Sequence, residues 1–289
     1  MSRIDIRVSE AAGFCWGVER ALRVAREAAQ NAGPGPVSTF GPLIHNPTVI
    51  AQLAAEGVGV IDDASGEIAG TVIVRSHGVE RDVQELLERR AAAVVDATCS
   101  FVKSAHEKAA RLHAAGYGVI VLGEPDHPEV RGILSYAGAD ALVVQSPEEL
   151  PTVLPRRVGV VVQTTQSPER LAVLTAALAP RVRELLVYNT ICDATERRQR
   201  AAVAMAAQVD LVIVVGGRNS ANTTRLAELC AAVQPRTYHV EEAGEIRPVW
   251  LAGVSVAGVT AGASTPRGQI EAVVARLESL AAHEERGER

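Results

Sequence analysis

Short apolar runs alternate with amphipathic stretches along the whole chain. The apolar runs are rich in Val and Ile, and several are apolar at consecutive positions, a pattern typical of strands buried on both faces of a parallel sheet. The predicted strands are residues 3–9, 36–40, 71–76, 92–98, 118–123, 141–145, 158–164, 185–190, 210–216, 236–240 and 254–260. The intervening amphipathic stretches, such as 18–30, 47–57, 79–90 and 270–282, have the spacing of helices. This alternation predicts an α/β fold with mostly parallel sheets and right-handed crossovers.

The same unit, a strand, a turn with a cysteine and then a helix, occurs three times. The cysteines are Cys15, Cys99 and Cys192. We therefore expect a threefold pseudo-repeat of α/β domains around one central cavity. The predicted units are residues 14–97, 98–193 and 194–281, with the N-terminal strand 1–13 joining the third unit and 282–289 forming a disordered tail.

Composition and charge narrow the classes of function. Aromatic residues make up 3% of the 289 residues and the net charge is −5, which argues against a nucleic-acid partner. The N-terminal sequence lacks the apolar core of a signal peptide, and no apolar stretch has the length of a membrane helix. We expect a cytoplasmic protein that is not bound to a membrane.

The repeated cysteines indicate a metal centre. The cysteines of cytoplasmic proteins rarely form disulfides. Three equivalent thiolates are suited to hold an iron–sulfur cluster in which one iron has no protein ligand. Zinc is the alternative metal, but the closely spaced ligands of most zinc sites do not occur here. Cys230 lies within a helical pattern and is expected to be a buried core residue.

Polar residues gather where the predicted strands end, which is where parallel sheets bind ligands. His45, His77 and His127 are candidate donors to phosphate oxygens. Glu129, in the segment DHPEV, is the candidate acid, because an enclosed anion-binding cavity favours a protonated carboxyl group. Each also has a structural interpretation, since a lone histidine is often structural and Glu129 suits a helix N-terminus. His106 is expected at the surface.

Two further loops carry hydroxyl and amide groups. GGRNSANTTRL follows a strand and precedes a helix, so its backbone N–H groups favour an anion, and AGASTP repeats this arrangement. Ser220, Asn222 and Ser264 therefore form a candidate diphosphate site. Thr164 is either part of the site or a helix N-cap. No nucleotide-binding glycine motif is present.

These motifs, in their order along the chain, resemble the 4-hydroxy-3-methylbut-2-enyl diphosphate reductase family. The resemblance rests on GFCWGVERAL, GPLIHNP, RSHGV, DATCSFV, DHPEV, QTTQS, NTICDATERRQ, RNSANTTRL and VTAGAS, which span the chain from about Cys15 to Ser264. The family catalyses the last step of the methylerythritol phosphate route to isoprenoids. The resemblance implies its fold, a trefoil of three α/β domains around a central iron–sulfur cluster.

The resemblance implies an assignment of roles. Cys15, Cys99 and Cys192 would hold a 4Fe-4S cluster, Glu129 would relay protons, and Thr164 would orient Glu129. The diphosphate of the small allylic substrate would be held by His45, His77, His127, Ser220, Asn222 and Ser264. Reductive dehydroxylation would give isopentenyl and dimethylallyl diphosphate, with electrons from a reduced ferredoxin or flavodoxin. We expect a monomer.

Two positions depart from the family pattern. Ala221 stands where a second serine is usual, and Ser100 follows Cys99 where proline is common. These departures leave open a paralogue with altered substrate preference. A second alternative is a three-cysteine iron–sulfur lyase of the quinolinate synthase type, which also uses three cysteines from a threefold α/β arrangement. A non-enzymatic iron–sulfur sensor is a third, and it would not require Glu129 or the histidines.

Overall fold

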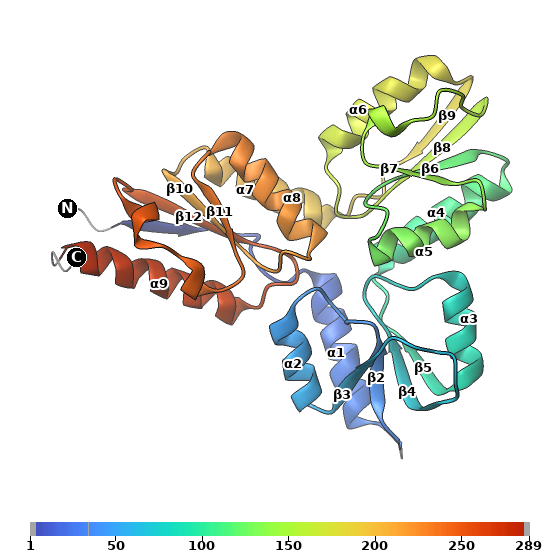
Figure 1. The fold of residues 1–289 in the computed structure, drawn as a ribbon, viewed down its shortest axis with the longest axis horizontal. Helices are drawn as coiled ribbons and strands as arrows, with labels where there is room; N and C mark the ends of the chain where they lie inside the picture. The colour runs from blue at the N-terminus through green and yellow to red at the C-terminus, as the bar shows by residue number, and fades with distance from the viewer. Residues whose placement is uncertain (1–3, 34, 286–289) are drawn as a thin grey trace. The chain divides into compact units, whose positions relative to one another are not determined.

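The computed structural model describes residues 4–33 and 35–285 and consists of parallel sheets covered by helices (Figure 1). It contains three four-stranded sheets, all of whose strand pairs are parallel. The predicted α/β class with three pseudo-repeated units is therefore confirmed. The chain divides into two compact units, of which the first comprises Met1–Trp16, His45–Pro47 and Asp193–Arg289, and the second Gly17–Ile44 and Thr48–Cys192.

The first unit contains one sheet with the strand order β1-β12-β10-β11. Its strands are β1 (Asp5–Val8), β10 (Leu211–Val215), β11 (Thr237–Val240) and β12 (Val256–Ala261). Its helices are α7 (Asp193–Ala206), α8 (Ala221–Val233) and α9 (Arg267–Glu285). The N-terminal strand β1 pairs with β12, with Asp5 opposite Val256.

Side chains of β10 alternate between two cores, as the two-residue period of a strand requires. Leu211, Ile213 and Val215 pack on the side of α9, whereas Val212 and Val214 pack on the side of α7 and α8. All five are fully buried. Burial on both faces explains why this strand is a continuous apolar run in the sequence.

The second unit contains two sheets. The first has the order β3-β2-β4-β5 and the second has the order β7-β6-β8-β9. The strands are β2 (Val37–Phe40), β3 (Val58–Ile61), β4 (Ile68–Val74), β5 (Ala91–Asp96), β6 (Gly118–Leu122), β7 (Leu142–Val144), β8 (Arg157–Val162) and β9 (Glu184–Tyr188). The helices are α1 (Trp16–Gln30), α2 (Pro47–Ala55), α3 (Arg81–Arg90), α4 (Ser100–Ala114), α5 (Pro128–Ala137) and α6 (Pro168–Leu178).

All three sheets share one topology. In the second unit, β2 lies between β3 and β4, and β5 pairs with β4; in the same way, β6 lies between β7 and β8, and β9 pairs with β8. In the first unit, β10 lies between β11 and β12, and the N-terminal strand β1 pairs with β12. The repeat that the cysteines indicate is thus also a repeat of strand order.

Two segments differ from the expectations. Strand β3 was not predicted, because it is a four-residue edge strand with one buried residue, Val58, and so carries little apolar signal. Helix α9 extends to Glu285 and so includes residues 282–285 of the expected tail. Ala281 is still buried, so the helix continues past the last packed turn. Residues 286–289 lie outside the described part of the chain.

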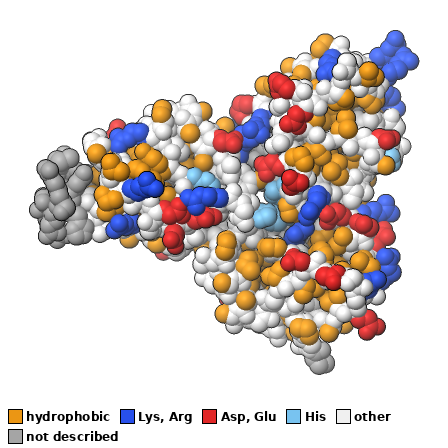
Figure 2. Space-filling view, viewed as in Figure 1, with side chains coloured by type: hydrophobic (Ala, Val, Ile, Leu, Met, Phe, Trp, Pro, Cys, Tyr) orange, Lys and Arg blue, Asp and Glu red, His pale blue; other side chains and the backbone are white. Residues whose placement is uncertain are grey.

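The surface mixes both signs of charge. Figure 2 shows basic and acidic side chains interspersed over the visible face of the molecule. Within the described residues, no helix has the length and apolar character needed to cross a membrane.

Candidate active site

Equivalent loops of the three sheets carry the predicted polar residues. The loops after β2, β6 and β10 place a polar side chain five residues beyond the end of the strand. These side chains are His45, His127 and Ser220. His127 and Ser220 are the N-caps of α5 and α8, so each side chain lies where helix N–H groups are exposed.

The backbones of the three cysteines are held by the same kind of hydrogen bond. Each backbone N–H donates to the carbonyl oxygen of a residue two positions beyond the end of the neighbouring strand. The bonds run from Cys15 to Ala263 (3.3 Å), from Cys99 to Ser76 (3.0 Å) and from Cys192 to Thr164 (3.1 Å). The neighbouring strands are β12, β4 and β8, each paired with the strand that leads to its cysteine. The three sulfurs thus occupy equivalent positions at the carboxyl ends of their sheets.

The thiols of these cysteines differ from that of Cys230. Cys15, Cys99 and Cys192 form no disulfide within the described residues and are partly exposed. Cys230 is fully buried, and burial raises its thiol pKa to about 11, which suits a core residue. Cys99 and Cys192 belong to the second unit and Cys15 to the first. Within either unit, the described residues contain no group of three or more His, Cys, Asp or Glu side chains that could hold a metal ion.

Glu129 lies at the start of α5 and is only 2% exposed. Thr164, in the loop after β8, bonds to both of its carboxyl oxygens. The Thr164 backbone N–H donates to Oε1 at 2.6 Å and its Oγ1 donates to Oε2 at 2.8 Å. Ser167, not Thr164, is the N-cap of α6. The hydroxyl group of Thr164 therefore donates its hydrogen bond to Glu129 and does not cap α6.

Burial has the largest effect on the pKa of Glu129. Loss of solvent raises the pKa of this carboxyl group to about 7, although the two hydrogen bonds from Thr164 lower it. A pKa near neutrality suits a general acid, because both protonation states are then accessible at the working pH. The residue is therefore poised to give up and regain a proton.

Two predicted histidines of the second unit contact each other, and one of them bonds to the backbone of Glu129. His127 accepts a hydrogen bond from the backbone N–H of Glu129 at its Nδ1 (3.1 Å). Its ring meets that of His77 edge to face, with 5.6 Å between centroids and 86° between planes. The structure thus brings together His77, His127, Glu129 and Thr164.

The first unit holds the remaining predicted residues. Ser264 donates its hydroxyl to the carbonyl oxygen of His45 at 3.2 Å, which ties together loops far apart in the sequence. The Oγ of Ser220 accepts from the N–H of Thr223 at 3.4 Å. The Nδ2 of Asn222 is buried and has no hydrogen-bond partner among the described residues. An unsatisfied buried donor of this kind is typical of a site that binds an acceptor-rich ligand.

Asn46 belongs to the candidate site, although no sequence motif indicated it. It is 2% exposed, and its Nδ2 donates to the carbonyl oxygen of Ser264 and to Oε1 of Gln269, both at 3.0 Å. Asn46 therefore fixes the loop of its neighbour His45 against the loop of Ser264. The one available signal was its place beside His45 after a predicted strand.

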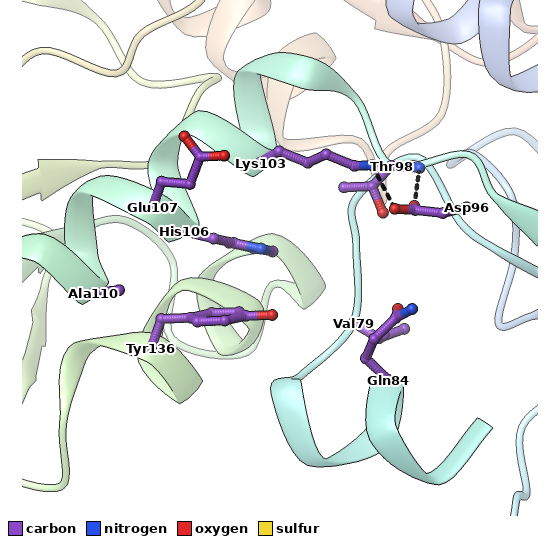
Figure 3. A pocket seen from close by; sticks show the side chains of 9 residues that line it. All are labelled: Val79, Gln84, Asp96, Thr98, Lys103, His106, Glu107, Ala110 and Tyr136. Atoms are coloured by element: carbon purple, nitrogen blue, oxygen red, sulfur yellow. Dashed lines mark hydrogen bonds and ion pairs between the residues drawn. The ribbon is translucent and has the colours of Figure 1, made fainter. Parts of the chain in front are cut away.

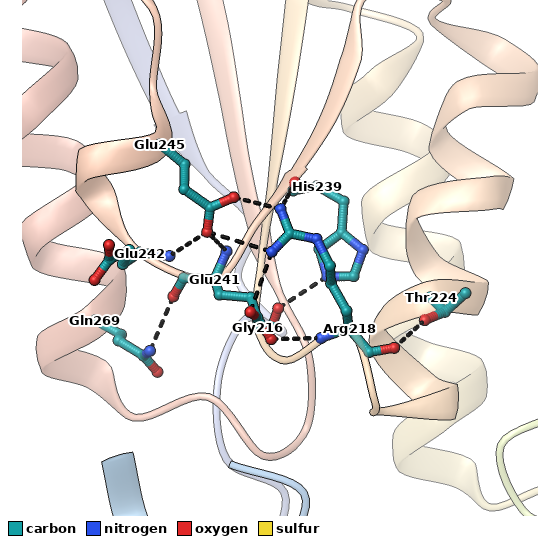
Figure 4. A network of polar contacts seen from close by, with 8 residues as sticks. All are labelled: Gly216, Arg218, Thr224, His239, Glu241, Glu242, Glu245 and Gln269. Carbon is teal, nitrogen blue, oxygen red and sulfur yellow. Dashed lines mark hydrogen bonds and ion pairs between the residues drawn. The ribbon is translucent and has the colours of Figure 1, made fainter. Parts of the chain in front are cut away.

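A polar network supports the loop that precedes Ser220 (Figure 4). The backbone N–H and Nη1 of Arg218 donate to the two carboxylate oxygens of Glu241, at 2.8 and 3.1 Å, and Arg218 also pairs with Glu245. Gln269 donates to the carbonyl oxygen of Glu241 at 3.0 Å, which connects this network to Asn46. Arg218 is 54% exposed, so the network contributes mainly to loop geometry.

His106 lines a separate pocket in the second unit (Figure 3). His106 was expected at the surface but is buried, and its ring stacks on Tyr136 with 4.9 Å between centroids. Burial lowers its pKa to about 4, so the ring is neutral near pH 7. The packing of α4 against α5, which no local pattern reports, covers this residue.

The two departures from the family pattern both lie at helix starts. Ala221 is the first residue of α8, buried between Ser220 and Asn222. Ser100 is the first residue of α4, directly after Cys99 as N-cap. Serine is compatible with a helix start, so Ser100 needs no compensating change.

Comparisons with known proteins agree across nearly the whole chain. A family model described as LytB protein matches residues 6–278. The chain is 50% identical over 280 residues to the 4-hydroxy-3-methylbut-2-enyl diphosphate reductase of Geobacter sulfurreducens, covering 96% of this chain and 98% of that protein. It is 48% identical over 279 residues to the protein of the same name from Geotalea uraniireducens, covering 96% and 98%.

Solved structures give the same result. A structure described as (E)-4-hydroxy-3-methyl-but-2-enyl diphosphate reductase, the terminal enzyme of the non-mevalonate pathway, is 41% identical. Its TM-score is 0.69, with coverage of 96% of this chain and 99% of that one. The E-1-hydroxy-2-methyl-but-2-enyl-4-diphosphate reductase of Plasmodium falciparum is 25% identical, with a TM-score of 0.85 and coverage of 95% and 88%.

Proposed function

Because this chain belongs to the LytB protein family, we propose that it reduces 4-hydroxy-3-methylbut-2-enyl diphosphate to isopentenyl and dimethylallyl diphosphate. The reaction breaks the carbon–oxygen bond of the terminal alcohol. It consumes two electrons and two protons and releases water. The observation that carries the proposal is the equivalence of the three cysteine loops, each with its N–H bonded to the end of a neighbouring strand.

We assign Cys15, Cys99 and Cys192 as the ligands of a 4Fe-4S cluster. The donor set fits this group, because all three thiols are partly exposed, none is in a disulfide within the described residues, and each follows a strand in sheets of the same topology. Such a cluster, held by these three thiolates, would supply electrons one at a time and would provide a Lewis-acidic iron for the substrate.

The diphosphate of the substrate is assigned to six side chains. Imidazole, hydroxyl and amide groups all donate to phosphate oxygens, and the N-termini of α5 and α8 add favourable dipoles. The six are His45, His77, His127, Ser220, Asn222 and Ser264. The buried Nδ2 of Asn222, which lacks a partner among the described residues, supports this assignment.

Glu129 is assigned as the catalytic acid. Its burial and its pKa of about 7 keep a substantial protonated fraction at neutral pH. Thr164 orients the carboxyl group through its two hydrogen bonds. The proton is then available to the leaving hydroxyl group, while burial limits exchange with solvent.

The electron donor is a separate reduced carrier. As the resemblance to the reductase family implies, we propose a reduced ferredoxin or flavodoxin as the source of single electrons. We further propose a monomer that works in the cytoplasm, where free thiols stay reduced.

An anaerobic assay tests the proposal. Protein purified without oxygen is expected to contain four irons and four sulfides per chain and to convert 4-hydroxy-3-methylbut-2-enyl diphosphate in the presence of a dithionite-reduced mediator. A preparation with a full cluster and no turnover would refute the proposed substrate. A preparation that binds only zinc would refute the proposed 4Fe-4S cluster.

A further inference from the structure

Arg198 is a buried arginine that contacts the loop of Cys15. It lies on α7, is 3% exposed, and its Nη2 donates to the carbonyl oxygen of Gly13 at 2.7 Å. Gly13 stands two residues before Cys15 and has φ of +98°, a conformation that side-chain-bearing residues rarely adopt. The peptide carbonyl is thus turned toward the guanidinium by a backbone that needs glycine.

Arg20 has the same relation to the loop of Cys99. It lies on α1, and its Nη1 donates to the carbonyl oxygens of Ala97 at 3.3 Å and Thr98 at 3.2 Å. Ala97 stands two residues before Cys99, as Gly13 does before Cys15. In each case, a helix that follows one cysteine supplies an arginine to the loop of another cysteine.

The loop of Cys192 is held by a different group. Thr190 stands two residues before Cys192, and its Oγ1 accepts from the backbone N–H of Val162 at 2.8 Å. Within the described residues, the hydroxyl group of Thr190 thus anchors this loop, whereas the loops of Cys15 and Cys99 are tied to a guanidinium through the carbonyl at this position.

The charge of these arginines matters because the site they adjoin is negative. Three thiolates give the centre a negative charge, and reduction adds another. A cation inside the protein is weakly screened, so it stabilises the reduced state and raises the reduction potential. The effect should be larger for buried Arg198 than for partly exposed Arg20.

We propose that Arg198 and Arg20 are positioning residues that fix the loops of Cys15 and Cys99 and raise the reduction potential of the bound cluster. The proposal rests on the proposed three-cysteine cluster. It does not depend on the identity of the substrate, because the potential is a property of the enzyme alone.

The test compares three variants of the full chain, reconstituted without oxygen and titrated potentiometrically in the absence of substrate. Arg198→Gln is expected to lower the potential and to speed loss of iron to a chelator by about tenfold. Arg198→Lys is expected to keep the potential near that of the wild type, yet to lose iron faster because lysine lacks the planar fork. Arg197→Gln is the matched control.

Arg197 is a suitable control because it is the neighbouring residue on the same helix but is exposed. It lines the same pocket of about 690 Å³ as Cys15 and Arg198. Its removal takes away one positive charge that water screens, so no change of potential is expected.

An unchanged potential in Arg198→Gln, or an equal shift in Arg197→Gln, would overturn the proposal. If Arg198→Gln does not fold, Arg20→Gln gives the same reading at the loop of Cys99, with a smaller lowering expected. A wild-type protein that assembles no iron–sulfur cluster would instead refute the proposed function, which keeps the two failures distinct.

Discussion

Thr164 holds both carboxyl oxygens of Glu129, one through its backbone N–H and one through its hydroxyl, at 2.6 and 2.8 Å. The same residue accepts the N–H of Cys192 through its carbonyl oxygen. A single loop after β8 therefore orients the proposed acid and one proposed cluster ligand. Burial raises the pKa of Glu129 to about 7, and the two bonds from Thr164 oppose that rise.

Removing the Thr164 hydroxyl should shift the pH dependence of turnover. In Thr164→Val the charged form of Glu129 loses one hydrogen bond, so its pKa rises above about 7. Activity that requires the protonated acid should then persist to higher pH before it falls. The measurement is kcat as a function of pH with a chemically reduced mediator. Thr164→Ser retains the hydroxyl and should restore the wild-type profile; a valine variant with an unshifted profile would contradict the assignment.

Glu129→Gln should abolish turnover while the cluster absorbance is retained. The same substitution should also change how the free energy of unfolding varies with pH. The folded protein holds the Glu129 proton up to a pKa of about 7, whereas the usual value is 4.5. The raised pKa contributes stability that is complete below pH 4.5 and is lost as pH rises through 7. The free energy of unfolding of the wild type, relative to the glutamine variant, should fall by about 3 kcal/mol across this range. Urea unfolding at several pH values measures it, and parallel curves would argue against a buried titrating carboxyl group.

Asn46→Ala should weaken substrate binding more than it slows the chemical step. The substitution removes two hydrogen bonds of a buried amide and frees the loop of His45 from that of Ser264. We expect a loss of about 2 kcal/mol in unfolding free energy and a rise in KM that exceeds the fall in kcat. Asn31→Ala is the control, because Asn31 is exposed and bonds only within its own helix end. Equal effects of the two substitutions on KM would exclude a positioning role for Asn46.

Ala221→Ser should tighten binding of the diphosphate substrate. The added hydroxyl lies between Ser220 and Asn222, and a hydrogen bond to a charged group is worth about 1.5–3 kcal/mol, or roughly tenfold or more in affinity. Isothermal titration with the substrate and oxidised enzyme gives the dissociation constant. Ala231→Ser, on the exposed part of α8, should leave affinity unchanged. Unaltered binding in Ala221→Ser would show that the hydroxyl is dispensable in this chain.

The sequence by itself determined the features that local chemistry encodes. Alternating apolar and amphipathic runs identified the α/β class and all strands except β3, whose four residues include only one buried side chain. The positions of polar residues at strand ends made the cysteines, the histidines and Glu129 candidates for the site, because the end of a buried strand is where a chain can first place a polar group.

Only the tertiary structure decided features that depend on distant parts of the chain. Thr164 is 35 residues from the carboxyl group that it orients, and Arg198 is 185 residues from the carbonyl group that it holds. The pairing of β1 with β12 and the burial of His106 likewise follow from packing between elements. Hydrophobic periodicity is a local property, whereas desolvation, hydrogen-bond partners and pKa values arise only when separate segments exclude water from one another.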